Sequence, residues 1–146
     1  MKANELMIGD WVEYRFTGWT EKGGVYKDYQ YVQISTTGKL YVKADNDRVA
    51  SADGEEFFPI PITPDILEEN GFEIVSARDD NAGTMEKYFY PRIGYVYRFS
   101  NGEWEVDLIG YGRGFSGAAK YRGVISYVHE LQHALRLCGI EKEIVL

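Results

Sequence analysis

Residues 95–108 have the sequence YVYRFSNGEWEVDL. Aromatic and β-branched residues alternate with polar ones on both sides of Asn101-Gly102, a dipeptide typical of two-residue hairpin turns. The pattern therefore predicts an antiparallel hairpin with this dipeptide as its turn. That turn sets a register in which one face carries three side-by-side pairs and the other carries one charged pair. The pairs are Phe99 and Trp104, Tyr97 and Val106, Tyr95 and Leu108 on the first face, and Arg98 and Glu105 on the second.

A long helix is predicted downstream of the hairpin, over residues 119–138. From Gly123 to Cys138 the apolar residues recur at the spacing of one helix face, and Gly139 ends the pattern. We expect this face to pack on the sheet. Its members are Val124, Tyr127, Val128, Leu131, Ala134, Leu135 and Cys138.

A shorter helix is predicted upstream, over residues 62–71. Thr63 is a good N-cap, Pro64 suits the first helical position, and Asp65 complements the helix dipole. Asn70-Gly71 is expected to end this helix after about two turns. The residues that follow, 72–111, are expected to form an antiparallel β-meander that contains the hairpin.

The residues before the short helix, 1–61, are rich in β-forming side chains. Runs such as 11–16, 25–34 and 40–42 are separated by glycine-containing turns, which predicts a small curled sheet or an SH3-like barrel. No linker, internal repeat or low-complexity tract divides the sequence. The sequence thus predicts a single α+β domain over residues 1–146, with the C-terminal helix packed on the sheet.

The composition is acidic, and this argues against several functional classes. With 23 acidic and 16 basic residues the formal net charge is -7, so binding to nucleic acid or to an anionic membrane is disfavoured. Cys138 is the only cysteine and can form no intrachain disulfide. No apolar run approaches the roughly 20 residues of a membrane span, and no signal peptide is recognisable. We therefore expect a cytoplasmic location and no membrane partner.

The predicted C-terminal helix contains the motif His129-Glu130-Leu131-Gln132-His133. Histidines four positions apart share one helix face and can bind one zinc ion, while Glu130 acts as general base toward a metal-bound water. Locally the motif resembles the signature of zincin metallopeptidases, and these are the only two histidines of the chain. A zinc hydrolase that uses His129, His133 and Glu130 is therefore one functional hypothesis.

Three observations argue against zinc. A catalytic zinc needs a third protein ligand, and the extended signature of one zincin group would require Gly at 136 and His at 139, where this chain has Arg136 and Gly139. An acidic third ligand could only be Glu141 or Glu143, directly after the helix. Both histidines also lie opposite the predicted core face, where a solvent-exposed pair needs no function. We therefore predict no metal ligand, no cofactor and no catalytic residue.

Three stretches, at the two ends and in the middle of the chain, carry a family resemblance. They are ANELMIGDWV at 3–12, PIPITPDILEENGFE at 59–73, and YVHELQH at 127–133 followed by GIE at 139–141. They resemble a family of small uncharacterised bacterial proteins, common in gut anaerobes and found in phage-like or mobile-element settings. In that family the positions of Glu130 and His133 are typically Gln and Asn, which do not suit a zinc hydrolase. The resemblance implies no activity.

The leading functional hypothesis is a non-enzymatic interaction or accessory module, of phage or mobile-element origin, that binds an unidentified protein partner. The zinc hydrolase is the alternative. A third hypothesis follows from the aromatic residues, which make up 15% of the chain and include 12 Tyr and 3 Trp. Exposed rings of this kind can stack on carbohydrates or nucleotides.

Overall fold

The computed structural model describes residues 7–19, 22–36, 41–43, 49–51, 57–80, 83–109 and 121–146. It contains two antiparallel sheets and two helices, which confirms the predicted α+β class. The chain divides into two compact units, which we call unit 1 (Met1–Ile60, with Leu146) and unit 2 (Pro61–Val145). The division falls at the predicted end of the β-rich part.

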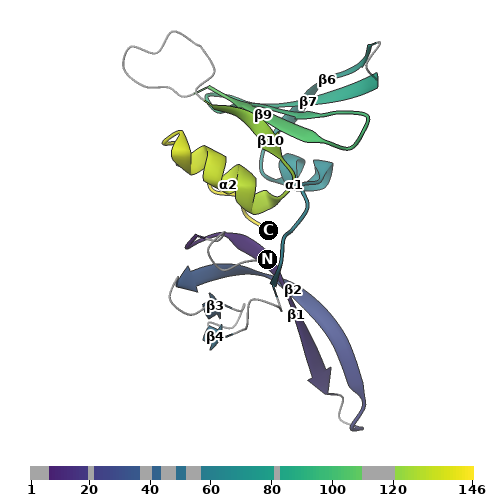
Figure 1. Cartoon of the computed structure of the whole chain (residues 1–146), viewed down its shortest axis with the longest axis vertical. Helices are drawn as coiled ribbons and strands as arrows, with labels where there is room; N and C mark the ends of the chain where they lie inside the picture. Colours follow the sequence, from purple (N-terminus) through teal and green to yellow (C-terminus); the bar gives the residue numbers. More distant parts are fainter. Residues whose placement is uncertain are drawn as a thin grey trace. The chain divides into compact units, whose positions relative to one another are not determined.

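Unit 1 is an antiparallel sheet of five strands in the order β4-β3-β2-β1-β5. The strands are β1 (Trp11–Trp19), β2 (Val25–Thr36), β3 (Tyr41–Lys43), β4 (Val49–Ser51) and β5 (Phe57–Phe58). β1 and β2 form a long hairpin (Figure 1). Among the described residues, β4 and β5 stand at the two edges and do not pair with each other. The predicted closure into an SH3-like barrel is therefore not supported.

Alternation along the strands gives the sheet of unit 1 one apolar face. Its core consists of Val12, Val32, Ile34 and Phe57, with Tyr14 packed against them. Asp10, which has no exposed surface, holds the start of β1, because its Oδ2 accepts the Met7 N–H at 2.7 Å. The Asp10 carbonyl in turn accepts the Ile34 N–H at 3.0 Å, which ties this turn to β2.

Unit 2 combines a second five-stranded antiparallel sheet with both helices. Its elements are α1 (Pro64–Glu69), β6 (Glu73–Asp80), β7 (Gly83–Tyr90), β8 (Gly94–Arg98), β9 (Trp104–Leu108), β10 (Tyr121–Ile125) and α2 (Val128–Leu137). The order β10-β9-β8-β7-β6 follows the chain, which confirms the meander predicted for residues 72–111 over its described parts, 72–80 and 83–109, and extends it by β10. Both helices lie on one side of this sheet (Figure 1), and Val96, Val106 and Leu108 are fully buried.

α1 begins and ends as its capping residues predict. The Thr63 Oγ1 accepts the Ile66 N–H at 3.3 Å, and Pro64 occupies the first helical position. Asn70 is the C-cap, and its backbone N–H donates to carbonyls of the last turn. Leu67 faces inward with no exposed surface. The predicted helix over 62–71 is confirmed.

Replacing Thr63 by alanine is expected to lower the free energy of unfolding by about 1 kcal/mol, because the Ile66 N–H loses its acceptor. Urea unfolding followed by circular dichroism measures this change. Thr63→Ser is the matched control, since it keeps the hydroxyl and should behave almost like the wild type. An alanine variant that unfolds at the wild-type urea concentration would show that the cap contributes nothing.

The β8–β9 hairpin forms, but its predicted register is wrong by one residue. The Phe99 N–H donates to the Glu103 carbonyl at 2.9 Å, and Gly102, with φ +86°, donates to the Phe99 carbonyl at 3.0 Å. The turn is thus a three-residue loop closed by a left-handed glycine, not a two-residue turn. Arg98 consequently lies opposite Trp104, and Val96 opposite Val106.

This slip exchanges the two faces of β8. Val96 is fully buried opposite buried Val106, whereas Tyr95, Tyr97 and Phe99 are only half-buried. The predicted contact of Phe99 with Trp104 and the predicted pair of Arg98 with Glu105 are both wrong. The physical reason is that valine can be buried completely without leaving a polar group unpaired, while a tyrosine hydroxyl needs water or a partner.

The helix predicted over 119–138 begins only at Val128. Residues 121–125 form β10, in which Gly123 pairs with Val106 and Ile125 with Trp104. Ile125 is buried, while Val124, which was expected in the helix core face, is 67% exposed. The backbone of β9 offers hydrogen bonds to this segment, and a helix there would leave that edge unpaired. Residues 119 and 120 lie outside the described part.

Candidate functional site

Glu130, the proposed general base, is directed at the start of its own helix. Its Oε2 accepts the Ser126 N–H at 2.6 Å and the Tyr127 N–H at 3.1 Å. Tyr127 is the N-cap of α2, so Glu130 stands at the third helical position, where a carboxylate satisfies unpaired backbone donors and complements the helix dipole. The carboxylate is thus engaged in capping rather than presented to a ligand.

His129 and His133 lie one helical turn apart, as predicted. Their ring centroids are 5.7 Å apart and the rings are nearly perpendicular, at 75°. His129 is, however, only 7% exposed and stacks on Tyr127, with 5.9 Å between centroids and 7° between planes. The prediction that both histidines point away from the core is therefore wrong for His129.

The reason lies in how much of α2 is covered. Its buried residues are Val128, His129, Leu131, Gln132, Ala134 and Leu135. They surround more of the helix than the single apolar stripe that the sequence pattern indicated, and they include two polar residues. Within the described ranges, no group of three or more His, Cys, Asp or Glu residues could hold a metal ion. The structure thus brings two imidazoles together without a third ligand in that part of the chain.

Zinc binding is testable directly. We expect the purified, untagged protein to retain less than one zinc per chain after dialysis and to cleave no peptide, because two imidazoles alone hold zinc weakly. Metal content is measured by mass spectrometry, with His133→Ala and Glu130→Gln as comparison variants. One zinc per chain that is lost in His133→Ala, with hydrolysis that is lost in Glu130→Gln, would establish a zinc hydrolase instead.

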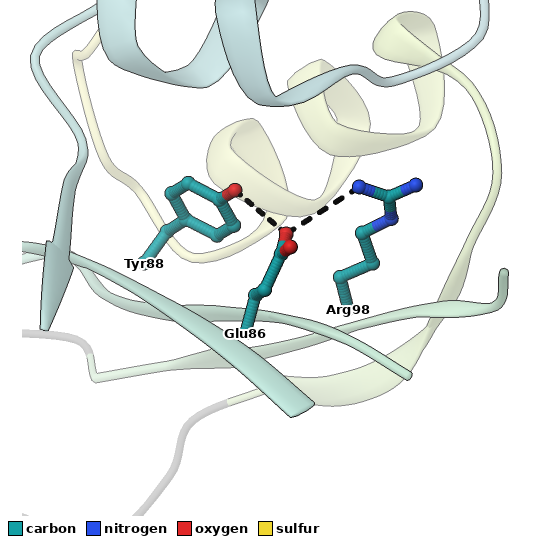
Figure 2. A network of polar contacts seen from close by, with 3 residues as sticks. All are labelled: Glu86, Tyr88 and Arg98. Atoms are coloured by element: carbon teal, nitrogen blue, oxygen red, sulfur yellow. Dashed lines mark hydrogen bonds and ion pairs between the residues drawn. The ribbon is translucent and has the colours of Figure 1, made fainter. Parts of the chain in front are cut away.

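A second cluster lies on β7 and β8, on the sheet face that carries the helices. Figure 2 shows Glu86 between Tyr88 and Arg98, with all three side chains rising from the sheet. The Tyr88 hydroxyl donates to the Glu86 Oε2 at 2.9 Å, and the Arg98 Nη1 lies 3.4 Å from the same oxygen. Glu86 and Arg98 are direct cross-strand neighbours, so the β7–β8 register creates the pair.

Burial, followed by the hydrogen bond to Glu86, raises the pKa of Tyr88 to about 12 from its ordinary 10.0. The phenolate therefore forms at lower pH in the unfolded chain than in the folded one. This contribution to stability is complete below pH 10 and is lost as the pH rises from 10 toward 12.

Between pH 10 and 12 we expect the free energy of unfolding of Tyr88→Phe to fall less than that of the wild type, because phenylalanine cannot ionise. Urea unfolding of both proteins from neutral pH to pH 12 measures the difference. Parallel decline of the two proteins over this range would contradict the assignment.

The opposite face of the unit 2 sheet carries a row of aromatic rings. The centroids of Phe89 and Tyr95 are 5.0 Å apart, and those of Tyr95 and Tyr97 are 6.0 Å apart. The Lys87 Nζ lies 4.1 Å from the Tyr95 centroid and 5.6 Å from that of Tyr97. We call these four residues, Lys87, Phe89, Tyr95 and Tyr97, the aromatic face. Burial, followed by the nearby Asp107 carboxylate, raises the pKa of Tyr97.

Charged side chains border the aromatic face on β9 and β10. The Arg122 Nε lies 3.6 Å from Glu105, and its Nη2 lies 3.4 Å from Asp107. Asp107 pairs with Tyr95 across the β8–β9 ladder, and Glu105 pairs with Tyr97. The border therefore places two carboxylates directly beside the tyrosine rings, with one arginine beyond them.

Unit 1 has an exposed tyrosine pair of its own. Tyr29 is 58% exposed and Tyr31 is 40% exposed, and their ring centroids are 5.9 Å apart on β2. Burial, then Tyr29 and Glu13, raises the pKa of Tyr31. Beside them the Arg15 guanidinium lies 3.6 Å above the Phe58 ring and 2.6 Å from Glu13.

No protein-family model, curated protein or solved structure matches this chain. In the described part, no helix is long and apolar enough to span a membrane.

The sequence analysis missed Glu86 and Arg98 as neighbours, although a signal was present. The turn that begins at Pro91 places Tyr90 opposite Gly94. Four residues further along each strand, Glu86 therefore lies opposite Arg98.

Proposed function

We propose that the protein is a non-enzymatic interaction module that binds a protein partner through the aromatic face of unit 2. The observation that carries this proposal is the row of three aromatic rings on a sheet face that the helices leave uncovered. Tyrosine, phenylalanine and arginine are enriched in the centres of protein–protein interfaces. Large rings also bury much surface at little cost in side-chain entropy.

The chemistry of the face favours a partner segment that carries lysine or arginine. Lys87 makes cation–π contacts with Tyr95 and Tyr97, and a cation of the partner would displace it from these rings. Glu105 and Asp107 border the rings, and the whole chain carries a formal charge of -7. Opposite charges across an interface raise the association rate and the specificity. The family resemblance adds an accessory role in a phage or mobile element to this proposal.

The test compares three baits in extracts of the source cells. The face variant is Tyr95→Ser with Tyr97→Ser, and the matched control is Tyr29→Ser with Tyr31→Ser, because both pairs lie two positions apart on a strand at similar ring distances. We expect a protein that is enriched by the wild type and the control but lost by the face variant. Its binding should weaken as salt rises. Equal enrichment by all three baits would contradict the proposal.

The exposed pair Tyr29 and Tyr31 supports a second candidate function, the stacking of a neutral carbohydrate ring. The net charge of -7 opposes phosphate-bearing ligands, so a sugar suits this pair better than a nucleotide. Titration with neutral oligosaccharides should shift the amide NMR signals around Tyr29 in the wild type and not in Tyr29→Ser. Shifts of equal size in both proteins would remove the tyrosine pair from this role.

A further inference from the structure

A small hollow opens beside Arg98 at the end of the unit 2 sheet. Its volume is about 180 Å³, and its lining residues are Glu86, Arg98, Phe99, Ser100 and Gly102. A hollow of this size has room for several waters or one small organic molecule. Its charged lining residues, Glu86 and Arg98, lie on the sheet face opposite the aromatic face, because Arg98 and Tyr97 are successive residues of one strand.

The hollow presents one positive and one negative group that retain hydrogen-bonding capacity. Both contacts of Glu86 go to Oε2, and among the described residues Oε1 has no partner. Within the same residues, Arg98 uses one guanidinium nitrogen toward Glu86, at 3.4 Å, which leaves the other donors of its planar fork for a ligand. The side chain of Arg98 is 42% exposed and that of Glu86 is 29% exposed, so solvent molecules reach both.

Each of the two charged groups also contacts an aromatic residue. The Tyr88 hydroxyl, on a ring that is 1% exposed, donates to Glu86 at 2.9 Å. The Arg98 guanidinium makes a cation–π contact with Trp104, at 5.6 Å from the ring centroid. A ligand therefore meets groups that are already oriented, and less conformational entropy is lost on binding.

We infer that this hollow binds a free α-amino acid, with the ligand carboxylate on Arg98 and the ligand ammonium on Glu86. The two opposite charges of the site lie side by side, so a simple anion is repelled by Glu86 and a simple cation by Arg98. A zwitterion with its charges one carbon apart avoids both repulsions. The arginine fork suits a carboxylate, which it can bind through two parallel hydrogen bonds.

The remaining walls leave space for the ligand side chain. Phe99 offers an apolar surface, and a Cβ added at Gly102 would meet nothing within 4 Å, so the loop is open there. The hollow is smaller than the roughly 300 Å³ at which pockets for larger ligands begin. A single amino acid therefore fits this volume.

The test titrates the full chain with glycine and follows amide NMR signals, with acetate and methylammonium as single-charge probes. We expect glycine to shift the signals of residues 98–102, and we expect each single-charge probe to bind at least about tenfold more weakly. Arg98→Gln and Glu86→Gln should each weaken glycine binding by about tenfold or more. Arg122→Gln is the matched control, because it removes an ion-paired arginine from the other face of the same sheet and should change nothing.

Three results would overturn the inference. One is the absence of shifts with glycine up to about 10 mM. Another is acetate binding as tight as glycine binding, which would make the hollow an anion site. The third is unchanged glycine binding in Arg98→Gln and Glu86→Gln, whose unperturbed spectra elsewhere would show that they fold. Since the aromatic face takes no part, none of these results bears on the proposed protein partner.

Discussion

Replacing Gly94 by alanine is expected to lower the free energy of unfolding of unit 2 by about 3–5 kcal/mol. Gly94 begins β8 with φ +131°, a conformation that side chains with a Cβ rarely adopt. A Cβ there would overlap the Asp107 carbonyl oxygen and lie 3.0 Å from the Ile109 nitrogen. Both are backbone atoms, the first in β9 and the second in the residue that follows it, whose N–H donates to the Ile93 carbonyl at 2.7 Å, so neither can move without breaking backbone hydrogen bonds. Urea unfolding followed by circular dichroism measures the loss.

Gly102→Ala is the control that separates the two causes of this loss. Gly102 also has a positive φ, +86°, but a Cβ at this position would meet nothing within 4 Å. Its replacement should therefore lower the free energy of unfolding by only about 1 kcal/mol, the cost of holding alanine at a positive φ. If both variants lost the same amount of stability, the steric explanation for Gly94 would be wrong.

Replacing Asn70 by alanine is expected to lower the free energy of unfolding by about 2–4 kcal/mol, because the variant loses the three hydrogen bonds of the buried Asn70 amide. Asn70 is 5% exposed, and its Nδ2 donates to the Ile66 carbonyl at 2.8 Å and to the Val145 carbonyl at 2.9 Å. Its Oδ1 accepts the Val145 N–H at 2.8 Å. The side chain thus joins the end of α1 to the C-terminal segment, where Ile144 is 1% exposed.

Hydrogen exchange gives this prediction a local signature. In Asn70→Ala the Val145 amide should exchange much faster, before the sheet unfolds. Asn101→Ala is the matched control, since Asn101 is an exposed asparagine that accepts one N–H, from Glu103 at 3.0 Å. It should cost less than about 1 kcal/mol. Unchanged protection of Val145 in Asn70→Ala would mean that other contacts hold the C-terminal segment.

The elements that were predicted correctly depend on residues close together in the chain. Thr63, Pro64 and Asn70 set the ends of α1 because a cap acts over three or four positions. The one-turn spacing of His129 and His133 follows from helix geometry alone. The meander follows from short strands joined by turns. The sequence by itself therefore determined the α+β class, the first helix and the existence of the hairpin.

Tertiary structure decided the features that depend on partners distant in the chain. Residues 121–125 became β10 because β9 offered an edge, and the hairpin took the register that buries Val96 opposite Val106. His129 is buried because α2 is covered on more than its apolar stripe. Such outcomes depend on which surfaces meet, and a local pattern carries no information about the opposing surface. The pairing of Glu86 with Arg98, and with it the hollow, exists only because β7 and β8 align in one register.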